Sequence, residues 1–598
     1  DVAIAAEAHG SLAVEVVVTP EAVGSTLVAA VSGGHGEASI PVFEGRLRAV
    51  DGYFSTHMDA MEAWSAERPR LYFLELELRR DGDRLHHLRE RFGFRSFEIA
   101  PERGLLVNGR PVRLKGINRH AFWPDSGRAL DPSHSRDDAE LIKSLNANAV
   151  RTSHYPPDPA FLEACDEIGL YVIDELPGWH DAYDTAVGEA LVAEMVRRDR
   201  NHPSILMWAN GNEGGWNADL DDAFARHDLQ RRPVIHPDAV FAGLDTVHYP
   251  SWEELAERLD DGAAANRRRR LLRRPLPLVL PTEALHGLYD GGHGAGLEAY
   301  WSLLLSHRRG AGIFLWSYLD EGVVRVDRGG VLDTAGNFAP DGIVGPYREK
   351  EASYGAVRRI WSPVQVANSR IASTEEPRLL LANRFDHASL SDVVFEWQWQ
   401  ELPAPGEMPA EPATGGSLVG PPIAPGSAGA LAVPPLPAGT VADALGIRAV
   451  GVDGRELGTW MLPVAGSLRN PPRLPLRPAA EEGVTVEVGA AGTILNGHGL
   501  VVELDGRGRL RALERDGVRV ELGPGPVPAS RRGAPREPSG SERLEDGVEY
   551  RLATGEWFRW HLEPGGWLRL DYRFQPRGRS PLAGVRFEVD EEDVAGMR

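Results

Sequence analysis

Between about residue 104 and residue 320, the chain alternates short apolar runs with amphipathic segments, and this alternation restricts the fold more than any other feature. Eight runs have the length and the flanking turn residues of buried strands. They are residues 112–120, 147–155, 170–176, 204–213, 233–237, 246–250, 276–283 and 312–320. Helical patterns follow most of them, at residues 135–143, 159–168, 189–198, 219–227, 252–259 and 297–307, the first with Ser135 as its expected N-cap. Eight strands alternating with helices predict a (β/α)8 TIM barrel with functional groups at the carboxyl ends of its strands.

Two of the eight runs end in a glutamate. Glu213 follows the apolar run Ile205–Trp208 and the turn Asn-Gly-Asn, and glycines on both sides let the backbone turn sharply beside it. Glu283 ends the run at 276–283, so the two residues follow strands four and seven. Each alone could be an ordinary loop glutamate. Together they are the paired carboxylates that glycoside hydrolysis needs, one to donate a proton and one to attack or to activate water.

β-Strand patterns flank the barrel on both sides. Residues 1–102 contain period-two or apolar segments at 11–20, 25–32, 71–78 and 92–99, which predict a β-sandwich. Residues 364–478 contain strand patterns at 379–383 and 393–399, and residues 403–437 read as a loop or linker because they are rich in Pro, Gly and Ala. Residues 479–598 again contain strands and turns, as at 499–504 and 567–572, with a mobile loop expected at 524–540. The predicted domains are therefore 1–102, 103–363, 364–478 and 479–598.

Composition excludes several classes of protein. A formal net charge of -22 argues against nucleic-acid binding, and no apolar run reaches the length of a membrane-spanning helix. The single cysteine, Cys165, excludes an internal disulfide and a cysteine metal cluster, and its helical spacing predicts a core residue. The arginine-rich run at 266–274 is compatible with polyanion binding, but a solvated connection fits the acidic chain better. Whether the chain forms a homo-oligomer, and in which compartment it works, stays open.

Long motifs within the barrel resemble glycoside hydrolase family 2, which includes bacterial β-galactosidases and β-glucuronidases. They are Gly116-Ile-Asn-Arg-His120 with Pro124, Asn146-Ala-Asn-Ala-Val-Arg-Thr-Ser-His-Tyr-Pro156, Cys165-Asp-Glu-Ile-Gly-Leu-Tyr-Val-Ile-Asp-Glu175, Arg198–Ser204 leading into Gly211-Asn-Glu213, Asp341–Val344 and Ile360–Pro363. The resemblance implies immunoglobulin-like sandwiches at 1–102, which ends in Arg91–Arg95, and at 364–478. It also implies a partial, galactose-mutarotase-like sandwich at 479–598, beginning near Asn496–Leu500.

The family resemblance also implies roles for individual residues in a retaining mechanism. Glu213 matches the acid/base and Glu283 matches the nucleophile. Asn212 matches the residue that hydrogen-bonds the sugar 2-hydroxyl, and Tyr249 matches the residue that donates a hydrogen bond to the nucleophile. His120 and His154 match histidines that line the sugar site, and Trp316 matches the tryptophan that forms a platform under the sugar ring. A buried hydrogen-bonding role in the core is the alternative for each histidine.

Proton donation requires a raised pKa, and the expected cause at Glu213 is desolvation by Trp208 and Trp216. A tyrosine hydroxyl or His286 is expected to keep Glu283 ionised.

Two departures from the family pattern bear on cofactor and sugar. In the β-galactosidase branch, the segment after strand three carries a Glu and a His that bind Mg2+. Here His180 matches the His, but Trp179 stands where the Glu is expected, which disfavours a magnesium site, and no metal or other cofactor is expected. The Asn-any-Lys signature linked to glucuronides is absent, and residues 316–322 are acidic, which favours neutral sugars.

The predicted function is a retaining exo-β-glycosidase acting on terminal β-D-galactosides, with carbohydrate as the only expected partner. The alternatives are another family-2 specificity, such as a β-glucuronide or a polysaccharide-derived β-glycoside, or a catalytically weak carbohydrate-binding relative. Because family members place a jelly-roll domain before the first sandwich, the sequence is expected to be a fragment that lacks it.

Overall fold

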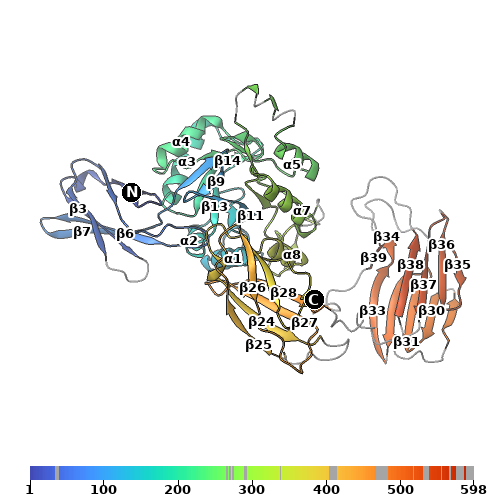
Figure 1. The fold of residues 1–598 in the computed structure, drawn as a ribbon. Helices are drawn as coiled ribbons and strands as arrows, with labels where there is room; N and C mark the ends of the chain where they lie inside the picture. Colours follow the sequence, from blue (N-terminus) through green and yellow to red (C-terminus); the bar gives the residue numbers. More distant parts are fainter. Residues whose placement is uncertain are drawn as a thin grey trace. The chain divides into compact units, whose positions relative to one another are not determined.

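The computed structural model describes residues 1–33, 39–263, 267–268, 271–272, 275–288, 293–336, 338–402, 412, 414–465, 483–489, 491–515, 517–528, 538–553, 555–563, 567–573 and 585–587. The chain divides into two compact units. The first comprises Asp1–Trp399, Thr414–Thr440 and Ala444–Leu462, and the second comprises Gln400–Ala413, Val441–Asp443 and Pro463–Arg598. Figure 1 shows the labelled α-helices of the first unit gathered around the strands β11 (Leu114–Asn118), β13 (Tyr171–Trp179) and β14 (Ile205–Asn212). Among the helices of the described residues, none combines the length and apolarity needed to cross a membrane.

The N-terminal segment forms two antiparallel sheets that enclose a common apolar core. The first sheet contains β1 (Val2–Ala6), β2 (Ser11–Val17) and β5 (Asp51–His57), and the second has the order β4 (Ile40–Arg46), β3 (Thr26–Gly33), β6 (Tyr72–Arg80), β7 (Asp83–Phe92). Alternate residues of β3 are buried, as expected for a strand with one face on the core.

The single strand predicted at 92–99 is wrong. β7 ends at Phe92, and β8 (Phe97–Ala100) belongs to a separate sheet with β9 (Gly104–Val107) and β10 (Arg110–Val112). Between β7 and β8 the chain changes partners: the carbonyl of Phe94 accepts the N–H of Trp64, and the N–H of Arg95 donates to the carbonyl of Ala6.

Parallel strands form the barrel in the order in which they occur along the chain. One sheet runs β15 (Val234–Ile235), β14 (Ile205–Asn212), β13 (Tyr171–Trp179), β12 (Ala149–Arg151), β11 (Leu114–Asn118), β19 (Gly312–Leu315), and β17 (Leu244–Asp245) pairs in parallel with β18 (Leu278–Val279). The N–H of Val279 donates to Arg309 O and its carbonyl accepts from Ala311, which joins β18 to the start of β19. The TIM barrel flanked by β-sandwiches is therefore confirmed as the fold class, whereas the four domain boundaries stay predictions.

The sixth barrel strand lies just before the predicted run at 246–250. β17 forms a hairpin with β16 (Val240–Phe241), and both turn residues, Ala242 and Gly243, have positive φ. This hairpin fixes the register of the strand, so Thr246 and the residues after it extend beyond the strand toward the barrel mouth.

Helices cover the barrel at the six predicted places, and α8 (Ala352–Ile360) is a further helix that the sequence analysis did not predict. The six are α1 (Pro132–Ser144), α2 (Pro159–Ile168), α3 (Thr185–Asp199), α4 (Asp221–His227), α5 (Trp252–Leu259) and α7 (His293–Ser306). Ser135 is not the cap of α1, because Asp131 accepts from the N–H of Ser133 and Pro132 occupies the first helical position. Cys165 is fully buried in the core between helices and strands, as its spacing predicts. Short 3-10 helices lie at Pro20–Ala22, Ala218–Leu220, Val326–Arg328 and Leu390–Asp392, and β20 (Val323–Arg325) pairs with β21 (Val331–Asp333).

Two further sheets follow the barrel. One contains β22 (Val364–Val366), β23 (Arg378–Asn383) and β26 (Ala428–Ala432), and the other has the order β25 (Thr414–Val419), β24 (Val394–Gln400), β27 (Ala444–Val450), β28 (Glu456–Pro463). The loop predicted at 403–437 is wrong at 414–419 and 428–432, where β25 and β26 lie. Both are edge strands, the position in which a sequence poor in β-branched residues is tolerated.

The second unit contains a five-stranded and a four-stranded antiparallel sheet. The strands are β29 (Thr485–Gly489), β30 (Gly492–Gly497), β31 (Leu500–Asp505), β32 (Leu510–Arg515) and β33 (Val518–Gly525), then β35 (Pro538–Arg543), β36 (Gly547–Leu552), β37 (Trp557–Glu563) and β38 (Trp567–Arg573), with β34 (Val527–Pro528) paired to β39 (Val585–Arg586). The middle of the loop predicted at 524–540, and most of the arginine-rich run, lie outside the described residues.

Candidate active site

Glu213 lies at the end of a fully buried strand. All eight residues of β14 are buried, and the chain then turns through positive φ at Gly211, Glu213 and Gly214. A Cβ on Gly211 would lie 2.2 Å from the carbonyl oxygen of Gly215, so only glycine fits this turn. The glycines predicted to shape the turn therefore do so, and the Glu213 side chain remains 23% exposed.

Glu283 follows β18 and is almost completely buried. The Tyr249 hydroxyl donates to its Oε2 at 2.6 Å, and the Arg151 guanidinium donates to its Oε1 at 2.7 Å. Burial by itself raises the pKa of this carboxyl, but the nearby His248, Arg151 and His154 and the tyrosine hydrogen bond outweigh burial and hold the pKa below its usual value. Glu283 is therefore an ionised carboxylate at neutral pH.

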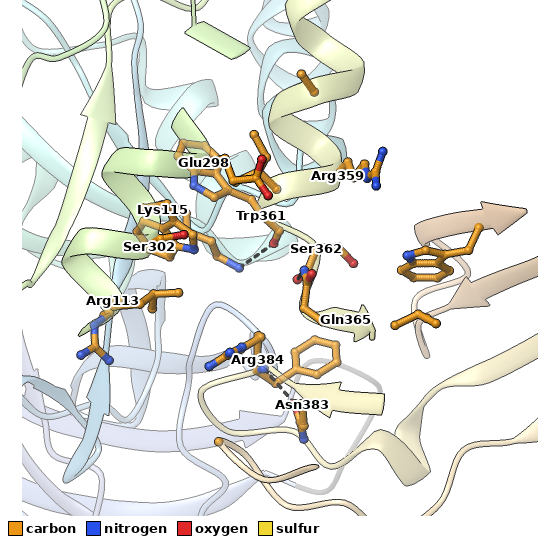
Figure 2. A pocket seen from close by; sticks show the side chains of 18 of the residues that line it. Arg113, Lys115, Glu298, Ser302, Arg359, Trp361, Ser362, Gln365, Asn383 and Arg384 are labelled. Carbon is orange, nitrogen blue, oxygen red and sulfur yellow. Dashed lines mark hydrogen bonds between the residues drawn. The ribbon is translucent and has the colours of Figure 1, made fainter. Parts of the chain in front are cut away.

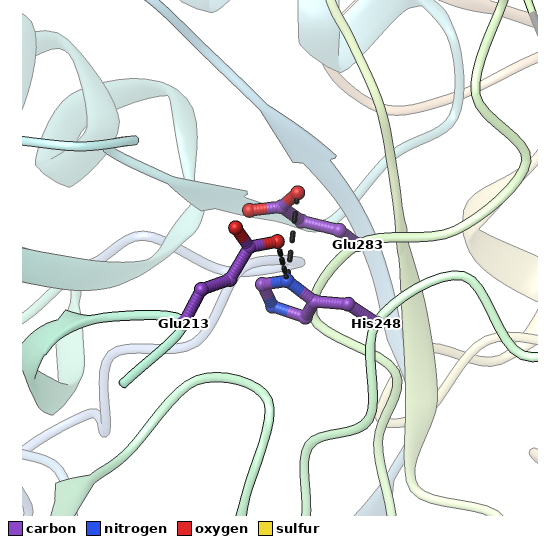
Figure 3. Close-up of side chains that lie close together, drawn as sticks. All are labelled: Glu213, His248 and Glu283. Carbon is purple, nitrogen blue, oxygen red and sulfur yellow. Dashed lines mark hydrogen bonds and ion pairs between the residues drawn. The ribbon is translucent and has the colours of Figure 1, made fainter. Parts of the chain in front are cut away.

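The two carboxylates lie close together with His248 between them. Glu213, His248 and Glu283 each contribute one atom to a group in which every atom lies within 4.8 Å of the others (Figure 3). The strand count that assigned Glu213 and Glu283 to strands four and seven thus brings both to one place at the barrel mouth.

Two side chains contact the carboxyl oxygens of Glu213. His248 Nδ1 lies 2.9 Å from Oε1, and the Trp179 indole N–H donates to Oε2 at 2.8 Å. The hydrogen bond from His248 is the largest cause that lowers the pKa of Glu213 to about 2, and partial burial only partly opposes it.

The expectation that Trp208 and Trp216 raise the pKa of Glu213 is therefore wrong. The Trp208 indole donates to Asp228, and the Trp216 ring stacks on His236 at 5.2 Å.

Arg151 connects most of the site, and sequence reasoning did not assign it a role. Its guanidinium is completely buried and donates to Glu175 at 2.6 and 3.0 Å, to Asn212 Oδ1 at 2.7 Å and to Asn118 Oδ1 at 3.0 Å, besides its bond to Glu283. The signal was present, because a charged residue ends the apolar run Ala149–Arg151 at a strand carboxyl end, where catalytic barrels place functional groups.

The remaining predicted residues form an aromatic wall beside Glu283. The rings of His154 and Trp316 stack at 5.2 Å with an interplanar angle of 13°, and the ring of His120 meets Trp316 edge-on at 5.5 Å. Burial lowers the pKa of His120 to about 3, so this ring is neutral. Asn212 is buried and held by Arg151. These contacts bring every predicted site residue into one cluster.

Of the two groups expected to hold the nucleophile, a tyrosine hydroxyl or His286, the structure shows the tyrosine hydroxyl at Glu283 and places His286 near Asp341. His286 Nε2 lies 3.5 Å from Asp341 Oδ2, while the Tyr249 hydroxyl makes the bond to Glu283.

Two carboxyl groups also contact the aromatic wall. Asp341 accepts from the Trp316 indole at 3.0 Å, and Glu321 Oε1 lies 3.8 Å from His120 Nε2. Burial, reinforced by Asp341 and Asp320, raises the pKa of Glu321 to about 8, and burial raises that of Asp341 to about 6. The Glu321 oxygen is buried without a hydrogen-bond partner.

The residues around Glu213 do not fit a magnesium ion. The indole N–H of Trp179 points at one carboxylate oxygen, and His180 Nδ1 donates to the backbone carbonyl of Glu213 at 3.1 Å. A hard cation prefers several oxygen ligands, and this position offers N–H donors instead. His248 Nδ1 lies 2.9 Å from Glu213 Oε1 and 3.6 Å from Glu283 Oε2.

A separate cavity of about 1240 Å³ lies near the start of β11 (Figure 2). Lys115 there donates to the Trp361 carbonyl, and Arg113 donates to the carbonyls of Gly310 and His307. These cations satisfy backbone groups, and the cavity includes neither Glu213 nor Glu283.

This protein has a (β/α)8 barrel whose fourth and seventh strands end in two carboxylates that lie close together. This arrangement is typical of barrel glycoside hydrolases. Comparison with protein families identifies the family. Residues 98–341 match the model of the glycosyl hydrolases family 2 TIM barrel domain, and residues 2–95 match that of glycosyl hydrolases family 2. The two matches cover more than half of the chain, which belongs to glycoside hydrolase family 2.

Relatives with assigned names are much longer than the matched segment. A β-galactosidase of Arthrobacter sp. is 33% identical over 380 residues, which is 57% of this chain and 36% of that protein. A β-galactosidase of Pectobacterium atrosepticum is 31% identical over 351 residues, 51% of this chain and 32% of that protein. The matches thus span about a third of these relatives.

A solved structure shares the fold. It is the Bifidobacterium dentium β-glucuronidase complexed with coumarin-3-O-glucuronide, with a TM-score of 0.50 and 21% identity, covering 61% of this chain and 66% of that chain.

Proposed function

We propose that the chain carries the active centre of a retaining β-glycosidase that removes terminal β-D-galactosyl groups. The observation that carries the proposal is the approach of Glu213 and Glu283 oxygens to within 4.8 Å. Retaining enzymes place the two carboxyl groups about 5–5.5 Å apart, whereas inverting enzymes leave about 6.5–9.5 Å for a water molecule.

The proposed roles follow from the environment of each carboxylate. Glu283, ionised and held by Tyr249 and Arg151, attacks the anomeric carbon while the bond to the leaving oxygen breaks. Glu213, which is the more exposed of the two, supplies the proton to that oxygen. Water then attacks the glycosyl-enzyme and gives its proton to Glu213, which restores the protonated acid at Glu213 and the free carboxylate at Glu283.

The aromatic wall supports the binding of a sugar ring. The face of Trp316 is a flat apolar surface, and His120 and His154 bring nitrogen atoms that exchange hydrogen bonds with hydroxyl groups. Asn212 is the proposed partner of the 2-hydroxyl.

A neutral sugar fits this site better than a uronate. A substrate carboxylate near Trp316 would face the Asp341 carboxylate, and like charges at close range repel. The β-galactosidase names of the relatives support the same choice.

A panel of 4-nitrophenyl β-glycosides tests the specificity. We expect hydrolysis of the β-galactoside with at least tenfold preference over the β-glucuronide, and release of the β-anomer first, observed by NMR. Preference for the glucuronide, or release of the α-anomer, would contradict the proposal.

Substitution of each carboxylate tests the roles. We predict that Glu283→Gln abolishes turnover because no nucleophile remains. Glu213→Gln should slow lactose hydrolysis by about 10²–10⁴-fold. It should spare glycosyl transfer from 2,4-dinitrophenyl galactoside, whose leaving group needs no proton. Glu253→Gln, an exposed residue of α5, is the matched control and should behave as wild type. Wild-type rates in both site variants would refute the assignment.

A further inference from the structure

His248 lies between the two carboxylates and is not among the residues that the family resemblance implies. Its side chain is 3% exposed, and its Nδ1 is 2.9 Å from Glu213 Oε1 and 3.6 Å from Glu283 Oε2 (Figure 3). Its Nε2 is 3.0 Å from the hydroxyl oxygen of Thr282. Both of its ring nitrogens therefore face oxygen atoms at hydrogen-bonding range.

The position of the Thr282 hydroxyl hydrogen decides which protons His248 carries. Thr282 Oγ1 also lies 2.9 Å from the carbonyl oxygen of Thr246. Two oxygens at this distance need a hydrogen between them, and a carbonyl has none, so the hydroxyl donates to Thr246. The contact to His248 must then take its hydrogen from Nε2.

A second hydrogen must lie between His248 and Glu213. Nδ1 and Oε1 are 2.9 Å apart, and a bare nitrogen lone pair facing a carboxylate at that distance is repulsive. Either Nδ1 carries the hydrogen or Glu213 does. In both cases His248 and Glu213, which we call the pair, together carry one proton more than a neutral imidazole beside an ionised carboxylate.

We propose that His248 is a positioning residue that stores the proton of the acid step and delivers it through Glu213. The inference rests on the proposed glycosidase function and deepens it. It also explains how Glu213 acts as an acid although its pKa is held near 2, because the proton resides on the pair and not on the carboxyl group alone.

The protons balance over both steps. In the first step the bond from the anomeric carbon to the leaving oxygen breaks, with its electron pair moving to oxygen, and Glu283 forms the new bond. Glu213 gives a proton to that oxygen and takes one from His248 Nδ1, which leaves a neutral imidazole. In the second step water loses a proton to the pair, its oxygen bonds to the anomeric carbon, and the bond to Glu283 breaks.

Other charged groups around the pair come from neighbouring strands. Arg151 from β12 neutralises Glu283, and His180 from the segment after β13 lies 3.9 Å from Glu213 Oε2. Asp238, in the segment between β15 and β16, accepts the backbone N–H of His248 at 3.0 Å. Tyr249 donates to Glu283. Glu213 is the carboxylate closest to Nδ1, so it receives the proton.

The variant His248→Asn separates proton storage from positioning. The Asn amide reaches the place of Nδ1 and donates to Glu213, but it cannot release a proton. We expect the rate of lactose hydrolysis to fall by about 10²–10⁴-fold at neutral pH. The rate with 2,4-dinitrophenyl galactoside should fall much less. The alkaline limb of kcat/KM for lactose should move toward acid, because the proton of the acid step then has only the Glu213 carboxyl group to hold it. If His248 only lowers the pKa of Glu213, the limb stays or moves toward alkali, and the proposal fails.

Neutron diffraction of the wild-type crystal at neutral pH checks the proton count directly, whether or not the variant folds. Two deuterons on His248, or one on Nε2 and one on Glu213, support the proposal, and a single deuteron on the pair overturns it. His87→Asn is the matched control, because His87 is an exposed histidine of β7. This variant should hydrolyse both substrates at the wild-type rates. Absence of any turnover by the wild-type chain would contradict the proposed function, and the neutron result would still decide the present inference.

Discussion

Arg151 shows how much of the site depends on one buried charge. It is completely buried, and its hydrogen bonds reach Glu175, Glu283, Asn212 and Asn118. Burying an ion costs free energy that only charged and polar partners offset. The buried carboxylates that bond Arg151 need its positive charge for the same reason.

We predict that Arg151→Met destabilises the first unit by about 3–5 kcal/mol, because it leaves the buried Glu175 carboxylate unpaired. Adding Glu175→Gln should recover part of that loss, since a neutral amide needs no counter-charge. Denaturant unfolding of the two variants measures the coupling. Arg448→Met is the control, because Arg448 also bonds two carboxylates but is exposed, and its loss should change the stability little. Equal costs at Arg151 and Arg448 would contradict this view of the site.

Trp179 determines what can bind beside Glu213. Its N–H occupies the carboxylate oxygen that a cation would need. We predict that treatment with a chelator leaves the hydrolysis rate unchanged, and that Trp179→Glu creates a Mg2+ dependence by adding oxygen ligands next to His180. The measurement is the initial rate with and without EDTA and added Mg2+. A wild-type rate that collapses with EDTA and returns with Mg2+ would show that the prediction is wrong.

At the scale of elements, the ends of β13 and β14 touch through glycines. A Cβ on Gly215 would lie 2.5 Å from the backbone of Gly178 and Trp179, so any side chain there must push the two segments apart. Both segments carry groups that contact each other in the site, since Trp179 bonds Glu213.

We therefore predict that Gly215→Ala lowers kcat by at least about tenfold, because displacement of about 1 Å misaligns a catalytic group. Gly355→Ala is the control, since Gly355 lies within α8 with open space around it. It should keep full activity and gain about 0.5–1 kcal/mol of stability from the better helix former. Kinetics and thermal melting of the two variants provide the comparison, and full activity of Gly215→Ala would exclude a tight contact.

The sequence predicts best the helices and strands in which the spacing of apolar residues shows which face is buried. α2 and α5 begin and end at the predicted residues, because capping residues and apolar spacing agree in both. The sequence analysis missed β17 and β26 because these strands form through hydrogen bonds to neighbouring strands and not through a clear apolar pattern. β17 is only two residues long, and β26 has small side chains and lies at the edge of its sheet.

The site divides in the same way. Glu213 and Glu283 follow apolar runs, so counting strands along the chain is enough to place both at the carboxyl end of the barrel. The part played by His248 depends on Thr282, which in turn depends on Thr246. Such a chain of hydrogen bonds between three different segments leaves no periodic trace in the sequence. The lowered pKa of Glu213 was missed for the same reason, since Trp208 and Trp216 are its neighbours along the chain and His248 and Trp179 are its neighbours in space.

At the scale of the whole molecule, the chain has more than one core. Buried residues of the barrel come from its strands and helices, as with Trp208. The described core residues of the second unit come from its own strands and include Trp560, whose indole also donates to the carbonyl of Gly508. Since the catalytic carboxylates belong to the first unit, damage to the second core should not reach them directly.

We predict at least two separate transitions in calorimetric unfolding, because units with separate cores do not follow two-state behaviour as one. Trp560→Ala removes a large buried ring and should cost about 3–5 kcal/mol, which lowers the melting temperature of one transition. Trp208→Ala should lower the other by a comparable amount and should also reduce glycosidase activity, whereas Trp560→Ala should leave activity intact at temperatures below its own transition. The measurement is differential scanning calorimetry of both variants beside kinetics on the same samples. If Trp560→Ala lowered every transition equally, the second core would be an integral part of the barrel's stability, and the chain would have to be treated as one cooperative unit.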